Sequence, residues 1–135
     1  MKHFKKENAY PNEAFIQEAI ENYFRAEGYA IEESRYTDLV VVKPNDRWVI
    51  EAKGMTSQTT VDFNTCLGQL IKSMTTPDAK YAIAVPNEIK YRNQSMKIPD
   101  YFRTINNLYI LVIDKNAQIQ VIHPSDRIED HWVTI

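Results

Sequence analysis

The spacing of apolar residues along the chain predicts three helices. Over Asn12–Glu27 the apolar side chains recur every three or four residues, which is the spacing of a helix with one buried face. Asn12 is a suitable N-cap for this helix, and Gly28 is expected to end it. The same spacing predicts a second helix from about Thr60 to Met74. A short third helix is expected near Pro99–Ile105.

Strands are expected where apolar and β-branched residues cluster between turn residues. The predicted strands are Tyr29–Glu33, Tyr36–Val42, Trp48–Lys53, Tyr81–Val85, Leu108–Ile113 and Gln118–Ile122. The turn residues of Lys43–Arg47 join the second and third of them into a hairpin. The resulting order is αβββαβ followed by αββ. Alternation of this kind predicts an α/β fold, in which helices cover the faces of a mixed sheet.

The chain has 135 residues and contains no repeat, low-complexity tract or linker. We therefore expect a single domain over residues 1–135. Its core should span about residues 12–86, and a C-terminal αββ extension about residues 87–135. The apolar fraction of 44% and the charged fraction of 25% are ordinary for a globular protein.

Charge and cysteine content narrow the possible partners and metals. The net charge of −2 gives no overall attraction to nucleic acid or membrane, so a local patch must hold any such partner. Cys66 is the single cysteine, which excludes an internal disulfide and a cysteine-based zinc site. No apolar run approaches the roughly 20 residues that a membrane helix needs. A cytoplasmic protein without membrane association is expected.

Charged residues occupy hairpin positions that would be apolar in an ordinary buried sheet. Because side chains alternate along a strand, Glu51 and Lys53 share one face of theirs. We expect Lys43 to pair with Trp48 across the turn. Asp38 then lies opposite Lys53, and a shift of the register by two residues keeps the same faces together. The hairpin therefore places two carboxylates and an ammonium in one patch.

A divalent cation would give this patch a physical reason to exist. Carboxylates that approach each other away from water repel unless a cation lies between them. The oxygen ligands of Asp38 and Glu51 favour Mg²⁺ or Mn²⁺, and no histidine or cysteine nearby suggests zinc. The alternative is a pair of exposed charges on an edge strand. The apolar character of the strand and the Gly54 that follows it argue against that alternative.

Two polar residues on the predicted helices are candidates to join the patch. On a helical wheel Glu13 falls between Ile20 and Phe24, inside the apolar stripe. It is either a first-turn acid that the helix dipole favours, or a further acid of the patch. Gln69 lies on the opposite side of its helix from Leu70, where a glutamine usually faces solvent.

This arrangement resembles the signature of the PD-(D/E)XK nuclease superfamily, whose restriction-endonuclease-like core has the order αβββαβ. The matching residues are Glu13 on the first helix, Asp38 and Glu51-Ala52-Lys53 on the hairpin, and Gln69 on the second helix. Thr37 stands where the name of the family has proline. The stretch Val61–Gln69, with Ala84–Pro86 after it, is also similar to the small excision-controlling-factor (XisH-like) branch of that superfamily.

The resemblance implies metal-dependent hydrolysis of phosphodiester bonds, without an organic cofactor. The metal ligands that it implies are Asp38, Glu51, the backbone carbonyl of Ala52, and Glu13. One or two Mg²⁺ or Mn²⁺ ions would polarise the phosphate and lower the pKa of a bound water. Lys53 would orient or deprotonate that water and offset the growing negative charge of the phosphate. Gln69 would orient Lys53, the water or a phosphate.

A basic segment offers a candidate contact to DNA. Residues 90–97 are predicted to form a loop in which Lys90, Arg92 and Lys97 grip phosphates and Tyr91 stacks on a base. The alternative is a solvated surface loop.

The leading functional interpretation is a small DNA endonuclease in a repair, recombination, restriction or mobile-element setting. One alternative is a catalytically silent, nuclease-like subunit that binds or regulates together with a partner. Another is a metal-free α/β binding domain. Because one chain carries one active site, we expect a homodimer or a hetero-partner for cleavage of both DNA strands.

Overall fold

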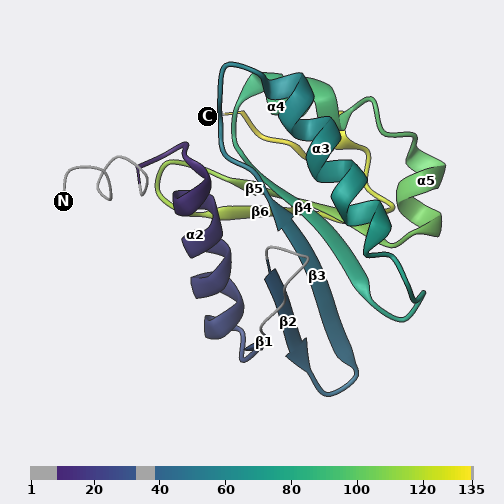
Figure 1. The fold of residues 1–135 in the computed structure, drawn as a ribbon. Helices are drawn as coiled ribbons and strands as arrows, with labels where there is room; N and C mark the ends of the chain where they lie inside the picture. Colours follow the sequence, from purple (N-terminus) through teal and green to yellow (C-terminus); the bar gives the residue numbers. More distant parts are fainter. Residues whose placement is uncertain (1–8, 33–38, 135) are drawn as a thin grey trace.

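One mixed sheet organises the computed structural model, which describes residues 9–32 and 39–134 (Figure 1). Six strands follow one another across the sheet in the order β1-β2-β3-β4-β5-β6, which is also their order along the chain. Their bounds are Ala30–Glu32, Leu39–Lys43, Asp46–Ala52, Lys80–Pro86, Leu108–Ile113 and Ile119–Ile122. Strands β3, β4 and β5 run parallel, and the remaining neighbours pair antiparallel.

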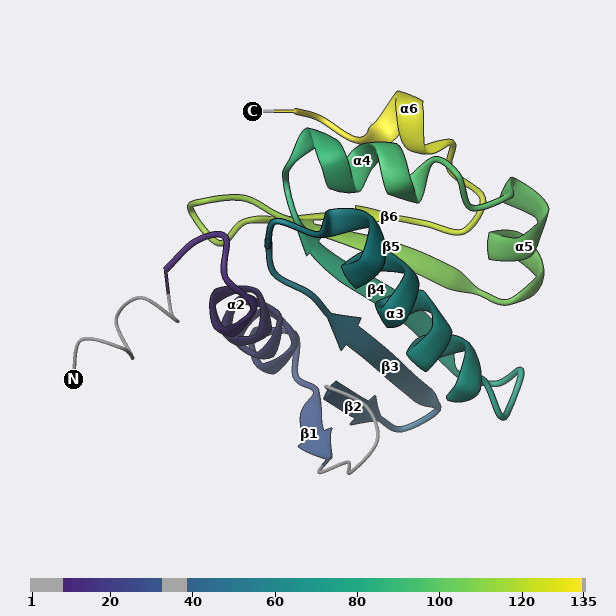
Figure 2. The same cartoon turned by 45° about the horizontal axis from the view of Figure 1, so that its top comes forward.

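Helices cover both faces of this sheet. They are α2 (Glu13–Ala26), α3 (Thr59–Lys72), α4 (Ile89–Ser95), α5 (Asp100–Ile105) and α6 (Ile128–His131). Figure 2 shows α2 on one side and α3, α4 and α6 on the other, which matches the two separate apolar clusters of the core. The predicted α/β class and the predicted αβββαβ order are therefore confirmed. Among the described residues, no helix is long and apolar enough to cross a membrane.

Helix α2 begins and ends where the sequence indicates. Asn12 occupies the N-cap position, and Gly28 follows the helix with a φ of 87°, a conformation that glycine adopts without strain. The buried side chains of α2 are Ile16, Ala19, Ile20 and Phe24. They pack against β2, β3 and β4, where Ala82 and Ala84 leave room for the helix.

The hairpin is tighter than predicted. Lys43 pairs with Asp46 rather than with Trp48, so only Pro44 and Asn45 form the turn. Asn45 has a φ of 61°, and asparagine is among the residues that tolerate this left-handed conformation. The pairing differs from the predicted one by two residues, so the side chains keep their predicted faces.

The segment after β4 completes the core that α3 covers. Ile128 and Trp132 pack into the same apolar cluster as Phe63 of α3. The guanidinium of Arg103 is fully buried and donates hydrogen bonds to the backbone carbonyls of His123 (3.1 Å) and Asp126 (2.5 Å). The predicted C-terminal αββ order is incomplete, because α4 precedes α5 and α6 follows β6.

Candidate functional site

The candidate site lies where β3 ends. Glu51 is 2% exposed, and the side chain of Lys53 is 24% exposed. The alternation of side chains places both on the face of β3 that also carries Val49 and is covered by α3. The strand end therefore carries a buried carboxylate followed by a half-buried ammonium.

Glu13 reaches this strand end from the first turn of α2. Its carboxylate lies 3.7 Å from the ammonium of Lys53. The side chain of Glu13 is 51% exposed, so it borders the apolar stripe of the helix rather than lying within it. The structure thus brings together two of the residues that the sequence singled out.

Gly54 allows α2 to approach the strand end closely. A Cβ atom at this position would lie 2.1 Å from the backbone nitrogen of Glu13 and 2.5 Å from the carbonyl carbon of Asn12. The next residue, Met55, donates its backbone N–H to the carbonyl of Pro11 at 2.8 Å. These backbone contacts position Glu13 beside Lys53.

A hollow of about 380 Å³ opens at this junction. Its walls include Glu13, Lys53 and Thr56, together with Asp62 from the first turn of α3. The hydroxyl of Thr56 donates a hydrogen bond to the carboxylate of Asp62. Sequence reasoning missed Asp62 as a site residue because an acid in the first turn of a helix is ordinary.

The described part of the site offers the oxygen atoms that a hard metal ion prefers, but it offers too few of them to hold the ion alone. Glu51 and the carbonyl of Ala52 offer oxygen atoms, which Mg²⁺ prefers. Within residues 9–32 and 39–134, no group of three or more His, Cys, Asp or Glu side chains is placed to hold a metal. The predicted ligand Asp38 lies outside the described residues.

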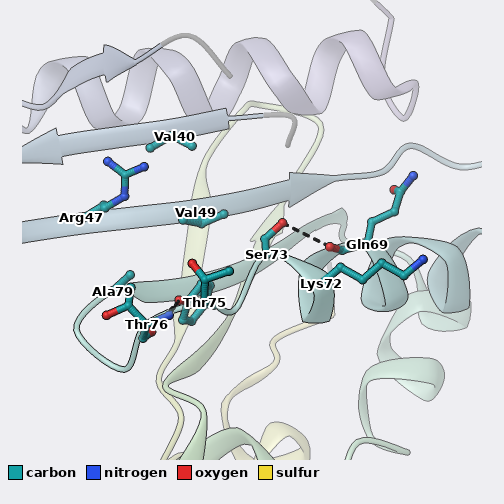
Figure 3. A pocket seen from close by; sticks show the side chains of 10 residues that line it. Val40, Arg47, Val49, Gln69, Lys72, Ser73, Thr75, Thr76 and Ala79 are labelled. Carbon is teal, nitrogen blue, oxygen red and sulfur yellow. Dashed lines mark hydrogen bonds between the residues drawn. The ribbon is translucent and has the colours of Figure 1, made fainter. Parts of the chain in front are cut away.

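Gln69 lies in a different hollow from Lys53. This second hollow, of about 520 Å³, is lined by Gln69 and Lys72 of α3 and by Val40 and Val49 of the sheet (Figure 3). Gln69 does not line the hollow that contains Lys53. The sequence predicted that Gln69 lies on an exposed face of its helix. It did not predict that this part of α3 lies away from the hollow at the end of β3.

The predicted DNA-binding loop is wrong in its structure. Residues 89–95 form α4, because Tyr91 and Ser95, one helical turn apart, are both fully buried. The phenol of Tyr91 donates a hydrogen bond of 2.7 Å to the carbonyl of Gly54. A side chain held in this way does not stack on a base in this structure.

The two lysines at the ends of the predicted loop lie together nevertheless. Lys90 and Lys97 line a polar groove of about 490 Å³ with residues 57–61, which lead into and begin α3. Arg92 is not among the residues that line this groove. Residues 57–61 line the groove, whereas Thr56 and Asp62 on either side of them line the hollow that contains Lys53.

Comparisons with known proteins identify the fold. No family model and no curated protein matches the chain. An XisH family protein from Nostoc punctiforme PCC 73102 has a similar structure, with a TM-score of 0.59 and 18% identity over 79% of this chain and 98% of that protein. An fdxN element excision controlling factor protein from Anabaena variabilis has the same TM-score and 21% identity, over 79% and 97%.

The sequence similarity of residues 61–69 and 84–86 to the XisH-like branch predicted a fold of this kind. At such identities the similarity is one of fold, so the XisH-like prediction is confirmed at the level of the fold.

Proposed function

We propose that this protein is a metal-dependent nuclease of PD-(D/E)XK type that hydrolyses DNA phosphodiester bonds at the end of β3. The observation that carries the proposal is the burial of the Glu51 carboxylate, which is 2% exposed, two residues before Lys53. Burying a carboxylate costs free energy unless other groups compensate its charge. A divalent cation together with a nearby ammonium provides such compensation, and both serve phosphodiester hydrolysis.

Each residue of the strand end has a distinct role in this proposal. Glu51, the carbonyl of Ala52 and Asp38 would hold Mg²⁺ or Mn²⁺, with Glu13 as a further acid. When bound, the metal polarises the phosphate and lowers the pKa of a water molecule. Lys53 orients that water and offsets the growing charge of the phosphate.

Glu13 also acts as a positioning residue for Lys53, because its carboxylate lies 3.7 Å from the ammonium. Gln69 lines the neighbouring hollow, so in this proposal its side chain contacts the substrate and does not orient Lys53. The groove beside Lys90 and Lys97 supplies phosphate contacts close to the reacting bond.

A second candidate is a nuclease-like subunit that binds or regulates without cutting. The Anabaena variabilis protein of similar fold is described as a controlling factor of fdxN element excision. By analogy, a controlling role in the excision of a mobile element suits this chain, and the net charge of −2 suits a protein that works with a partner.

A cleavage assay distinguishes the two candidates. Wild type and Lys53→Ala are incubated with supercoiled plasmid, single-stranded DNA and branched DNA, each with Mg²⁺ or Mn²⁺. The nuclease proposal expects metal-dependent cleavage by wild type and none by the variant. Equal cleavage by both proteins would point to a contaminating nuclease. No cleavage by either, with no rise in melting temperature on addition of Mn²⁺, would favour the silent subunit.

A further inference from the structure

The hollow beside Gln69 lies on the same face of β3 as the candidate active centre. Val49 forms part of its floor, and the alternation along the strand places Val49, Glu51 and Lys53 on one side. Figure 3 shows the hollow between the sheet and the C-terminal half of α3. A ligand in this hollow would therefore lie along the path that leads to Glu51.

The floor of the hollow is apolar and its rim is polar. Val40, Val49, Ala79 and Tyr81 form buried parts of the floor. The rim carries hydroxyls and the exposed side chain of Gln69. A volume of about 520 Å³ falls in the range of sites that hold small organic molecules, and the combination suits a flat apolar group with polar edges.

The two cations of the rim are not equivalent. Arg47 is already held by Glu32, whose carboxylate accepts hydrogen bonds of 3.1 and 3.2 Å from the guanidinium. Lys72 makes no ion pair with any residue that the structure describes. Lys72 is therefore the cation that an anionic group of a ligand would meet.

Lys72 and Gln69 lie at the end of the hollow nearer the active centre. In Figure 3 both side chains lie toward the end to which the β3 arrow points, and Arg47 lies at the opposite end. Because Glu51 and Lys53 follow Val49 in that direction, a phosphate held by Lys72 would lie between the hollow and the strand end.

We propose that this hollow binds one nucleotide unit, with its base on the Val40 and Val49 floor and its phosphate toward Lys72. Gln69 would contact the edge of the base, since an amide can both donate and accept hydrogen bonds. The inference rests on the proposed nuclease function and adds the substrate class. A base that enters such a hollow is not paired, so the substrate is single-stranded or has a base turned out of its duplex.

Methyl NMR of valine tests the position of the base. Deoxyadenosine 5′-monophosphate and a short oligodeoxyadenylate are titrated separately into the full chain, with EDTA present so that no cleavage occurs. Stacking of a purine should shift the methyl signals of Val40 and Val49. Val133, which is 62% exposed and lines neither this hollow nor the groove of Lys90 and Lys97, should not shift.

The two ligands separate the two possible sources of the nucleotide. Tighter binding of the oligonucleotide than of the monophosphate would support a nucleotide within a strand. Methyl shifts with the monophosphate but not with the oligonucleotide would indicate that the hollow binds a free nucleotide. No shift at Val40 and Val49 with either ligand, or an equal shift at Val133, would overturn the proposal.

A pair of lysine variants tests the phosphate contact. Lys72→Gln should lower the salt dependence of oligonucleotide binding by about 0.7 in the slope of log K against log salt, the value for one phosphate contact to a single strand. Lys115→Gln is the matched control, because Lys115 is also exposed and makes no ion pair with a described residue. Equal slopes in wild type and Lys72→Gln would overturn the assignment.

The failure of this inference is distinguishable from the failure of the nuclease proposal. Methyl shifts without any metal-dependent cleavage would retain the nucleotide site and reject the nuclease. Metal-dependent cleavage that Lys53→Ala abolishes, without methyl shifts, would retain the nuclease and reject the nucleotide site.

Discussion

The ammonium of Lys53 lies 3.7 Å from the carboxylate of Glu13, and this pair joins the end of β3 to the first turn of α2. The contact depends on the backbone as much as on the charges. Gly54 lets the start of α2 approach the strand, and the N–H of Met55 bonds to the carbonyl of Pro11. The geometry of the candidate site can therefore be tested separately through its charges and through its backbone contacts.

Glu13→Gln should reduce cleavage without destabilising the fold. Both side chains of the pair are partly exposed, so the free energy of unfolding should change by less than about 1 kcal/mol. Metal-dependent cleavage should fall by about 10- to 100-fold, the usual effect of losing a residue that orients a metal-site group. Cleavage rates and urea denaturation measure the two effects.

The matched control for Glu13→Gln is Glu21→Gln. Glu21 also lies on α2, and its carboxylate is 3.7 Å from the guanidinium of Arg25. This pair is remote from the strand end, so cleavage should be unchanged. Equal losses of cleavage in the two variants would remove the positioning role of Glu13.

Gly54→Ala should destabilise the protein by about 3 kcal/mol, because the added methyl group meets backbone atoms that have no room to move. Gly68→Ala is the control within α3. A Cβ at Gly68 would meet no atom within 4 Å beyond the adjoining backbone of its own helix, and alanine favours a helix by up to about 1 kcal/mol over glycine. Urea denaturation should show opposite signs for the two variants. A neutral Gly54→Ala would contradict the close approach of α2.

Tyr91→Phe should lower the free energy of unfolding by about 1–3 kcal/mol. The variant leaves the carbonyl of Gly54 without the buried hydrogen bond of 2.7 Å. Tyr101→Phe serves as the control, because Tyr101 is 70% exposed and its change should stay within about 0.5 kcal/mol. Chemical denaturation at neutral pH compares the two, and equal stabilities would contradict the role given to Tyr91.

Stability should fall in alkaline solution. Burial raises the pKa of Tyr91 above its ordinary value of 10.0, and burial together with the hydrogen bond to Glu88 raises that of Tyr10. Each phenol ionises more readily in the unfolded chain, so the stability from its burial is complete below pH 10 and is lost as the pH rises beyond it. The urea midpoint should fall less steeply above pH 10 in Tyr91→Phe than in wild type. Identical slopes would contradict the assignment.

Glu51→Gln should abolish stabilisation by Mn²⁺. A metal at 100 times its dissociation constant adds about 2.7 kcal/mol to a protein that binds it only when folded. The variant removes the buried carboxylate that we propose as a metal ligand, so its melting temperature should not respond to Mn²⁺. Glu18→Gln, on the exposed side of α2, should retain the full response. A Glu51→Gln variant that responds like wild type would place the metal elsewhere.

Local patterns were sufficient for the long elements of the fold. The strand Leu108–Ile113 was predicted to the residue, since it is a continuous apolar run between turn residues. Helix α4 was missed because only Tyr91 and Ser95 of its seven residues are buried, which is too short a pattern to reveal a helix. The hairpin turn was predicted too long, because Pro44 and Asn45 are sufficient to reverse the chain.

The candidate site was predictable where it depends on one strand. Alternation placed Glu51 and Lys53 on one face. The predicted pairing of the hairpin differs from the observed one by two residues, and a shift by an even number leaves every side chain on its predicted face. The separate hollow of Gln69 and the proximity of Asp62 depend on how α3 lies along β3. That placement results from packing between distant parts of the chain, so no local pattern contains it.

The hydrogen bond from Tyr91 to Gly54 has a consequence for modular exchange by recombination. A gene fragment that ends at Pro86 would encode the whole αβββαβ order, yet it would lack Tyr91 and the wholly buried strand β5. Strand β4, apolar over most of its length, would then present an open edge to other chains and promote aggregation. The smallest segment of this architecture that can pass intact between genes is therefore longer than its topological core.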